Sequence, residues 1–545
     1  MKKSIISLCL LAISVASFAS DTIWVKHPQI PVLIDRVDNV LCYLRVEAER
    51  GERFDEVKLR LTGDFRPEEV KAIKLYYGGI ERAERKNSFH YAPVDYISKD
   101  MPGKTLIANP AYSVMQSMTT DIEGEISLSS QQPLMPGVNY FWVSIEMQRH
   151  TSLLSTMTAE VTEVTINGKS RLLHPATDQP IVRRMGIGVR HAGDDGSAAF
   201  RIPGLVTTNA GTLLGVYDVR YNNSADLQEY VDVGLSRSRD GGQTWEAMRL
   251  PLSFGEQGGL PKGQNGVGDP AILVDKQTGT IWVVAAWTHG MGNGRAWFNS
   301  QQGMELHETA QLMMARSDDD GQSWSEPINV TSQLKQPEWF FLLQGPGNGI
   351  SMEDGTLVFA SQYIGADRIP NAGIMYSKDH GKTWQMNQPA RVNTTEAQVA
   401  EIEPGVLMLN MRDNRGGSRA VSITKNMGQS WTEHPSSRSA LPEPVCMASL
   451  IHCKATDNSL GRDILLFSNP NTTKERKDIT IKASLDGGVT WLEKHQLLLD
   501  EDYNWGYSCL TMIDRETVGI LYEGSTAHMV FQAIRLKDII EEGNR

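Results

Sequence analysis

The most informative segment of the sequence is Ser238-Arg239-Asp240-Gly241-Gly242-Gln243-Thr244-Trp245, because versions of it recur along the chain. Three further complete copies begin at Ser317, Ser377 and Ser484, and a degenerate copy begins at Thr424. In each copy Asp and Gly bend a tight turn, hydroxyl groups bond the turn backbone, and Trp is suited to packing between neighbouring units. We therefore interpret these boxes as architecture rather than as calcium-binding loops.

A second repeat alternates with the boxes and opens apolar strands. Its turns lie at Gly211, Gly279, Gly355 and Gly405, each followed by a short apolar run. About four strands per unit and about six units are typical of a β-propeller. Residues 181–545 are therefore predicted to form a six-bladed β-propeller whose inner strands run toward one mouth.

The region before the repeats has a different pattern. Alternating runs such as Val57–Leu61 and Val138–Ile145 predict half-buried antiparallel strands, and hence a β-sandwich over residues 21–175. The segment His174–Pro180 has linker composition. The predicted fold class is all-β, a β-sandwich followed by a propeller. The first domain could bind carbohydrate through exposed aromatic residues, although core packing is the commoner role for residues such as Tyr76 and Tyr77.

Composition and the N-terminus restrict the class of protein. With 40% hydrophobic and 22% charged residues among 545, the chain is neither disordered nor fibrous. Its net charge of -12 argues against nucleic acid as a partner. Residues 1–19 have the charged start, apolar middle and small-residue end of a signal peptide, which predicts an exported protein, periplasmic or secreted. No later apolar run is long enough for a transmembrane segment.

Cysteine spacing gives little support for a metal. Cleavage of the signal would leave four cysteines, Cys42, Cys446, Cys453 and Cys509, without the spacing of a zinc site. We expect no metal and no cofactor. Disulfide pairing and oligomeric state stay open.

Charged residues follow several of the apolar strands. Arg220 ends the run from Leu213, Arg412 ends the run from Leu407, and Glu523 follows the run from Val518. Because strands of this kind end at a shared rim or axial cavity, charge is predicted to converge there.

These features together resemble a known enzyme family. The motif Phe200-Arg201-Ile202-Pro203, followed by four complete boxes, resembles the bacterial exo-α-sialidases (neuraminidases) of glycoside hydrolase family 33, over about residues 181–540. The resemblance implies hydrolysis of terminal sialic acid from glycoproteins, glycolipids and oligosaccharides, with retention through a covalent tyrosyl intermediate. Sialylated glycans would be the substrates. The alternatives are a trans-sialidase, an intramolecular trans-sialidase, or a non-catalytic sialic-acid-binding propeller.

The resemblance also implies an arginine clamp. The family's three arginines match Arg201, Arg412 and Arg476, and Glu523 matches the residue that supports the first of them. A sugar whose anomeric carbon bears a carboxylate needs permanently charged, rigid donors that bond oxygens in pairs, which arginine supplies.

The remaining family positions imply the catalytic groups. Tyr507 matches the nucleophile, Glu396 its general base, and Asp226 the acid/base, while Arg220 and Asp269 match positions on the hydroxyl side of the sugar. A neutral phenol can approach a carbon that carries a carboxylate without like-charge repulsion. Its proton must then pass to a nearby base.

Overall fold

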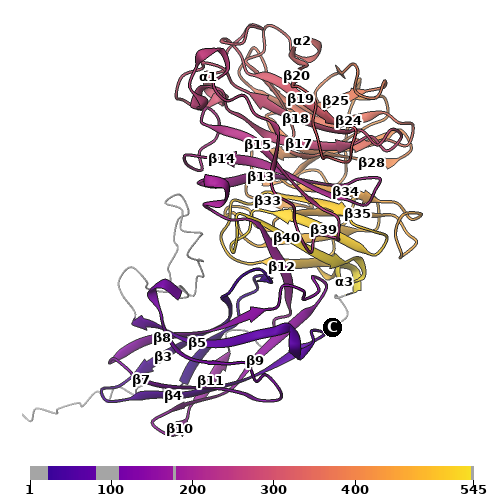
Figure 1. Ribbon diagram of the computed structural model, residues 1–545. Coiled ribbons are helices and arrows are strands. Elements are labelled where there is room, and N and C mark those ends of the chain that lie inside the picture. Colours follow the sequence, from indigo (N-terminus) through magenta and orange to yellow (C-terminus); the bar gives the residue numbers. More distant parts are fainter. Residues whose placement is uncertain (1–21, 81–109, 176–179, 542–545) are drawn as a thin grey trace, which may run out of the picture.

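The computed structural model describes residues 22–80, 110–175 and 180–541, and the described chain is all-β, as predicted (Figure 1). The predicted signal peptide, residues 1–19, lies outside the described residues. The only α-helices among the described residues are three short ones: α1 (Ala296–Asn299), α2 (Thr331–Leu334) and α3 (Leu536–Glu541).

Two sheets of the N-terminal part pack on a shared apolar core. The first has the order β11 (Leu172–Pro175), β1 (Thr22–Lys26), β3 (Asn39–Ala48), β8 (Gly137–Met147), β5 (Val70–Ile80) and β6 (Val114–Thr119). The second contains β9 (Thr156–Ile166), β4 (Arg53–Gly63), β7 (Ile126–Pro133) and β10 (Lys169–Ser170). Phe54 of β4 stacks on Phe141 of β8 at 4.1 Å, so the alternating apolar residues of both sheets meet between them.

Two local expectations in this part have different outcomes. Tyr76 is buried and stacks on Trp142 at 4.2 Å, which confirms core packing as its role. The linker prediction is wrong at its start, because His174 and Pro175 belong to β11, which pairs in parallel with β1. The ring of His174 lies edge-on to Trp24 at 4.0 Å, and this contact favours a strand over a free linker.

One strand joins the two parts of the chain. β12 (Arg183–Arg190) pairs with β9 and with β2 (Val32–Leu33) of the N-terminal part, and its later residues pair with β40 (Met529–Arg535). In Figure 1 this strand runs from the indigo and purple sheets into the yellow one.

The C-terminal part consists of successive sheets whose strands pair antiparallel, except that β22 pairs in parallel with β17. The first contains β13 (Ala199–Thr207), β14 (Leu213–Arg220), β15 (Val231–Ser238) and β16 (Arg249–Leu252). The second contains β17 (Val267–Val274), β18 (Ile281–Trp287), β19 (Gln311–Ser317), β20 (Ile328–Asn329) and β22 (Gly347–Asn348). The third contains β21 (Phe341–Gln344), β23 (Ile350–Ser351), β24 (Leu357–Ile364), β25 (Pro370–Ser377), β26 (Gln385–Met386) and β27 (Arg391–Val392).

The later sheets continue this order. The fourth contains β28 (Thr394–Glu403), β29 (Val406–Asp413), β31 (Ala420–Thr424) and β32 (Thr432–Glu433), with the small pair β30 (Gly417–Ser418) and β33 (Pro442–Glu443) beside it. The fifth contains β34 (Ser449–Cys453), β35 (Ile464–Pro470), β36 (Ile479–Ser484) and β37 (Gln496–Asp500). In the last sheet β38 (Ser508–Met512) and β39 (Thr517–Tyr522) lead to β40 and β12.

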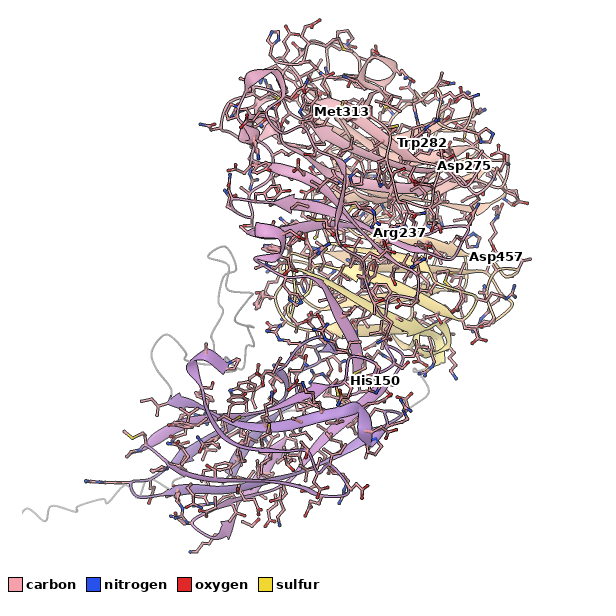
Figure 2. The ribbon with its side chains drawn as sticks, viewed as in Figure 1. His150, Arg237, Asp275, Trp282, Met313 and Asp457 are labelled. Carbon is pink, nitrogen blue, oxygen red and sulfur yellow. The ribbon has the colours of Figure 1, made fainter. Side chains whose placement is uncertain are left out.

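The boxes form the turns that their residues predict. In the first copy Ser238 Oγ donates to Asp240 and accepts from the N–H of Gly242, while Asp240 accepts from the N–H of Thr244. The other three complete copies repeat these bonds. Two box tryptophans also contact the neighbouring sheet: Trp245 lies 5.2 Å from Phe531, and Trp384 lies 6.3 Å from Trp282, which Figure 2 labels.

Other sequence-based expectations can be compared with the described residues. Cys42, Cys446, Cys453 and Cys509 are buried, unpaired thiols. Within residues 22–80, 110–175 and 180–541, no helix is long and apolar enough to cross a membrane. The same ranges hold no cluster of three or more His, Cys, Asp or Glu side chains arranged to ligate a metal.

Candidate active site

A cavity of about 500 Å³ opens where the predicted charged residues meet. Five of the nine predicted site residues line it: Asp226, Asp269, Glu396, Arg412 and Tyr507. The other four each contact a member of that set, as the distances below show. The structure therefore brings together side chains from β13, β14, β17, β28 and β29, from the loop that follows β14, and from the segments next to β36, β38 and β39.

Tyr507 lies just before β38 and is 6% exposed. Its Oη donates to Glu396 Oε1 at 2.5 Å and accepts from Arg412 Nη1 at 3.1 Å. Arg412 Nη1 also lies 2.6 Å from Glu396 Oε2. Burial and the adjacent Glu396 carboxylate raise the pKa of Tyr507 well above its ordinary value, against the opposing pull of Arg412 and Arg476. The phenol is thus neutral and already bonded to a proton acceptor.

Local strand geometry brings Glu396 and Arg412 together. The two residues lie on the paired strands β28 and β29, whose register shifts between Thr394 and Ala397. A bulge of this kind re-aims a side chain relative to its neighbours. Glu396 thereby meets Arg412 near the end of β29.

Glu523 holds Arg201 and two segments of backbone. This fully buried carboxylate accepts from Arg201 Nε at 2.9 Å and Nη2 at 3.3 Å. It also accepts from the backbone N–H groups of Ile202 and Tyr507, each at 3.0 Å. Ile202 has a φ of +60°, which is costly for a β-branched residue. The bonds to Glu523 hold this conformation beside Arg201.

Backbone packing around the arginine motif is tight. A Cβ at Gly204 would lie 2.4 Å from the carbonyl oxygen of Gly347, so this position requires glycine. The register between β13 and β14 shifts between Arg201 and Gly204. Arg201 Cζ lies 5.5 Å from the ring centroid of Tyr507 and 5.0 Å from that of Trp505.

Arg220 connects Asp218 and Asp226. Its Nη2 lies 2.8 Å from Asp218 Oδ2 and its Nη1 lies 2.9 Å from Asp226 Oδ1. Arg201 Nη1 lies 3.9 Å from Asp226 Oδ1. Burial alone would raise the pKa of Asp226, but the charges of Arg220 and Arg201 outweigh it and lower that pKa. The Asp226 side chain is 46% exposed, so it can meet a ligand.

Asp269, on β17, is bonded to this group through its backbone. Its backbone N–H donates to Asp218 Oδ1 at 2.8 Å, and its φ is +57°. Burial raises the pKa of Asp218 against the pull of Arg220. Burial and the charge of Asp218 raise the pKa of Asp269 well above its ordinary value.

Arg476 completes the predicted set. It donates to the backbone carbonyl oxygens of Trp505 at 3.0 Å and Val445 at 3.3 Å. Its Cζ lies 5.7 Å from the ring centroid of Tyr507. Three guanidinium groups therefore surround one phenol.

Sequence reasoning missed several residues of the site. Asp218 had a visible signal, because it is an acidic residue inside an apolar strand, two positions before Arg220 and on the same face. For Trp505, which packs on Arg201, the only signal in the sequence was its position two residues before Tyr507. Arg295, whose Nη2 lies 3.7 Å from Asp226, and Phe298, which also lines the cavity, had none.

Family models match both parts of the chain. Residues 20–170 match the N-terminal domain of BNR-repeat neuraminidase, and residues 202–523 match a BNR repeat-like domain. A sialidase of Bacteroides fragilis (strain YCH46) is 63% identical over 544 residues, which cover 99% of this chain and 100% of that protein.

Solved structures agree with these matches. The Hadza microbial sialidase Hz136 has a TM-score of 0.89 and 60% identity, and the match covers 95% of this chain and 100% of the other. A leech intramolecular trans-sialidase, at 18% identity and a TM-score of 0.57 over 90% of this chain and 94% of the other, shares the fold. The sequence-based assignment to the sialidases is confirmed, and the chain belongs to the sialidase (BNR-repeat neuraminidase) family.

Proposed function

We propose that the protein is an exo-α-sialidase that removes terminal sialic acid from glycans with retention, through a covalent bond to Tyr507. One observation carries the proposal: Tyr507 Oη bonds to Glu396 inside a cavity where three arginines surround the ring. This combination supplies a neutral nucleophile, a base for its proton and a positive field for the substrate carboxylate.

Arg201, Arg412 and Arg476 would bind that carboxylate. A unit charge pair at 4 Å contributes about 4 kcal/mol at an effective dielectric constant near 20. Three guanidinium groups around the Tyr507 ring, of which that of Arg412 lines the cavity, therefore outweigh, locally, the net charge of -12. Glu523 neutralises part of this charge in the free protein and orients Arg201.

In the first step Tyr507 Oη attacks the anomeric carbon and its proton passes to Glu396. The bond from the anomeric carbon to the leaving oxygen breaks, and Asp226 protonates that oxygen. In the second step Asp226 takes a proton from water as the water attacks the same carbon. The bond between the anomeric carbon and Tyr507 Oη breaks in this same step, and Tyr507 regains its proton from Glu396, which restores the starting state.

Asp226 must carry a proton to act as an acid, although Arg220 and Arg201 lower its pKa in the free protein. A bound substrate carboxylate offsets the charge of Arg201 and so raises the pKa of Asp226. Substrate binding thereby favours the protonated acid that the first step requires.

We further propose that the six C-terminal sheets are the blades of a propeller over residues 181–545. The first strands of three sheets lie together, because β13 of the first sheet contacts β17 of the second sheet and β38 of the last. In the last sheet, β12 pairs beside β40 as the fourth strand. Residues 21–175 form the preceding domain in this proposal, and residues 1–19 direct export. That the first domain binds carbohydrate stays a prediction.

Trapping of the glycosyl–enzyme tests the function. Incubation with 2,3-difluorosialic acid should add one difluorosialyl group to Tyr507, seen by peptide mass spectrometry. With 3'-sialyllactose, NMR should show free sialic acid, first as the α-anomer. Label on another residue would overturn the Tyr507 mechanism, and a 2,7-anhydro product would indicate intramolecular transfer instead of hydrolysis.

A further inference from the structure

A second buried glutamate in the C-terminal part accepts hydrogen bonds from the same kinds of group as Glu523. Glu443, at the end of β33, is 0% exposed. It accepts from Arg419 Nη1 at 3.2 Å and from the backbone N–H groups of Asp413 at 2.8 Å and Cys446 at 3.1 Å. Glu523 likewise accepts from one guanidinium and two backbone N–H groups. Each carboxylate ties two chain segments to one arginine.

Arg419 is also fully buried, and its donors are used. Its Nη1 donates to the carbonyl oxygen of Cys446 at 2.6 Å, in addition to Glu443. Its Nε donates to Asn410 Oδ1 at 2.7 Å, and its Nη2 donates to the Asn410 carbonyl oxygen at 3.1 Å. Asn410 lies on β29, two residues before Arg412. The Glu443–Arg419 pair therefore bonds to β29 on both sides of Arg412.

The same pair fixes the segment that receives Arg476. Cys446, bonded to both members of the pair, follows Val445, whose carbonyl oxygen accepts from Arg476 at 3.3 Å. Val445 has a φ of +52°, which is costly for a β-branched residue. Such a conformation persists only where surrounding bonds hold it. Here the bonds to Cys446 do so.

We propose that Glu443 and Arg419 are positioning residues, a buried pair that sets Arg412 and Arg476 at the spacing that a substrate carboxylate requires. This inference rests on the proposed function, in which those arginines bind the carboxylate. The pair lies outside the residues that line the cavity and acts through the backbone. A guanidinium fork bonds a carboxylate only in a narrow geometry, so a small backbone shift reduces affinity for the charged group.

The test compares two ligands of nearly equal size. One is 2-deoxy-2,3-didehydrosialic acid, and the other is its C1 carboxamide, which has no charge at that position. The ratio of their inhibition constants measures how well the arginines bind the carboxylate. We expect wild-type protein to favour the acid by about 100-fold or more. A wild-type ratio near one would overturn the proposed function itself.

The Glu443→Gln variant should reduce that ratio at least about tenfold, mainly by weaker binding of the acid. If this variant is not recovered folded, Arg419→Lys serves the same purpose, since lysine keeps the charge but cannot bond Asn410 and Cys446 together. The matched control is Arg237→Met. Arg237, which Figure 2 labels, is 4% exposed, is bonded to Glu246 and Asp320, and is not among the cavity-lining residues.

Loss of stability alone would lower the active fraction and leave the ratio unchanged, as expected for Arg237→Met. A wild-type ratio retained in folded Glu443→Gln or Arg419→Lys would overturn the positioning role while leaving the proposed function intact. Restoration of at least half of the lost preference by Glu443→Asp, which keeps the charge, would support it further.

Discussion

Carboxylates at the box turns and carboxylates at the cavity are the same chemical group in opposite surroundings. At the turns, hydrogen bonds from Ser323 lower the pKa of Asp319 to about 2. Against the effect of burial, turn donors also lower the pKa values of Asp240, Asp379 and Asp486. At the cavity, burial raises the pKa values of Asp218 and Asp269. The repeated carboxylates therefore hold turns, whereas Asp218 and Asp269 are buried where their negative charge is costly.

If the cavity residues act in catalysis and the box residues in folding, Tyr507→Phe should abolish turnover while the protein stays folded. We expect kcat on an aryl sialoside to fall about 10³-fold or more, because the attacking oxygen is gone. The free energy of unfolding should fall by about 3 kcal/mol or less, since the hydroxyl group loses two hydrogen bonds, one to Glu396 and one from Arg412. The control is Tyr503→Phe, whose hydroxyl bonds to Glu475 on the surface. Unchanged turnover of Tyr507→Phe would contradict the mechanism.

Asp226→Asn should reduce activity to different extents on substrates with poor and with good leaving groups. We expect a loss of about 10²- to 10⁴-fold on sialyllactose, whose leaving oxygen needs a proton. The loss on 4-methylumbelliferyl sialoside should be much smaller, because that leaving group is stable as an anion. Steady-state kinetics on both substrates measures the difference. Equal losses would argue against the acid role.

Glu523→Gln should lower both the stability of the protein and its affinity for the sugar, whereas a box substitution should lower stability alone. Arg201 would keep its buried charge without its nearest counter-ion, which costs about 3 kcal/mol of the free energy of unfolding. The variant should also bind didehydrosialic acid more weakly, since Arg201 and Tyr507 lose a shared acceptor. Urea unfolding and inhibition constants measure the two effects. Wild-type stability would show that the pair contributes little.

The pH dependence should report the state of Asp226. Its pKa is lowered in the free protein, so the protonated acid is lost as pH rises through that low value. The basic limb of kcat/KM, which reports free protein, should therefore lie at lower pH than the basic limb of kcat, by about one pH unit. Profiles on sialyllactose provide the measurement. Coincident limbs would show that substrate does not raise the pKa of Asp226.

Asp319→Asn should give the smallest effect, and only on stability. We expect a loss of about 1 kcal/mol at pH 7 and unchanged kcat/KM. Because the folded pKa of Asp319, about 2, lies below the unfolded value, its contribution is present above pH about 4 and is lost as pH falls toward 2. In Asp319→Asn the free energy of unfolding should therefore fall less between pH 4 and pH 2 than it does in the wild-type protein. Asp318→Asn, on the same turn, is the control, and equal losses in both variants would contradict the specific role of Asp319.

The fold was largely predictable, because its signals are repeated and local. The four complete boxes could be recognised within single turns, and the charges at Arg220, Arg412 and Glu523 could be read from strand ends. The bond between Arg201 and Glu523 joins residues 322 positions apart, and only the family resemblance connected them.

The parts that could not be predicted depend on tertiary neighbours. Glu443, on β33, and Arg419, between β30 and β31, belong to no repeated motif, and only packing shows that both are fully buried. The strand character of His174–Pro175 likewise depends on β1, which lies far away in sequence. Composition alone could not reveal either feature.

β12 has a mechanical consequence for the whole molecule. Its ladder bonds continue from one part into the other, and Leu33 of β2 packs into the apolar cluster of the last C-terminal sheets. Bending at this junction would break main-chain bonds and expose that cluster to water. We therefore expect the two parts to move together, with the first part fixing the direction in which the cavity faces.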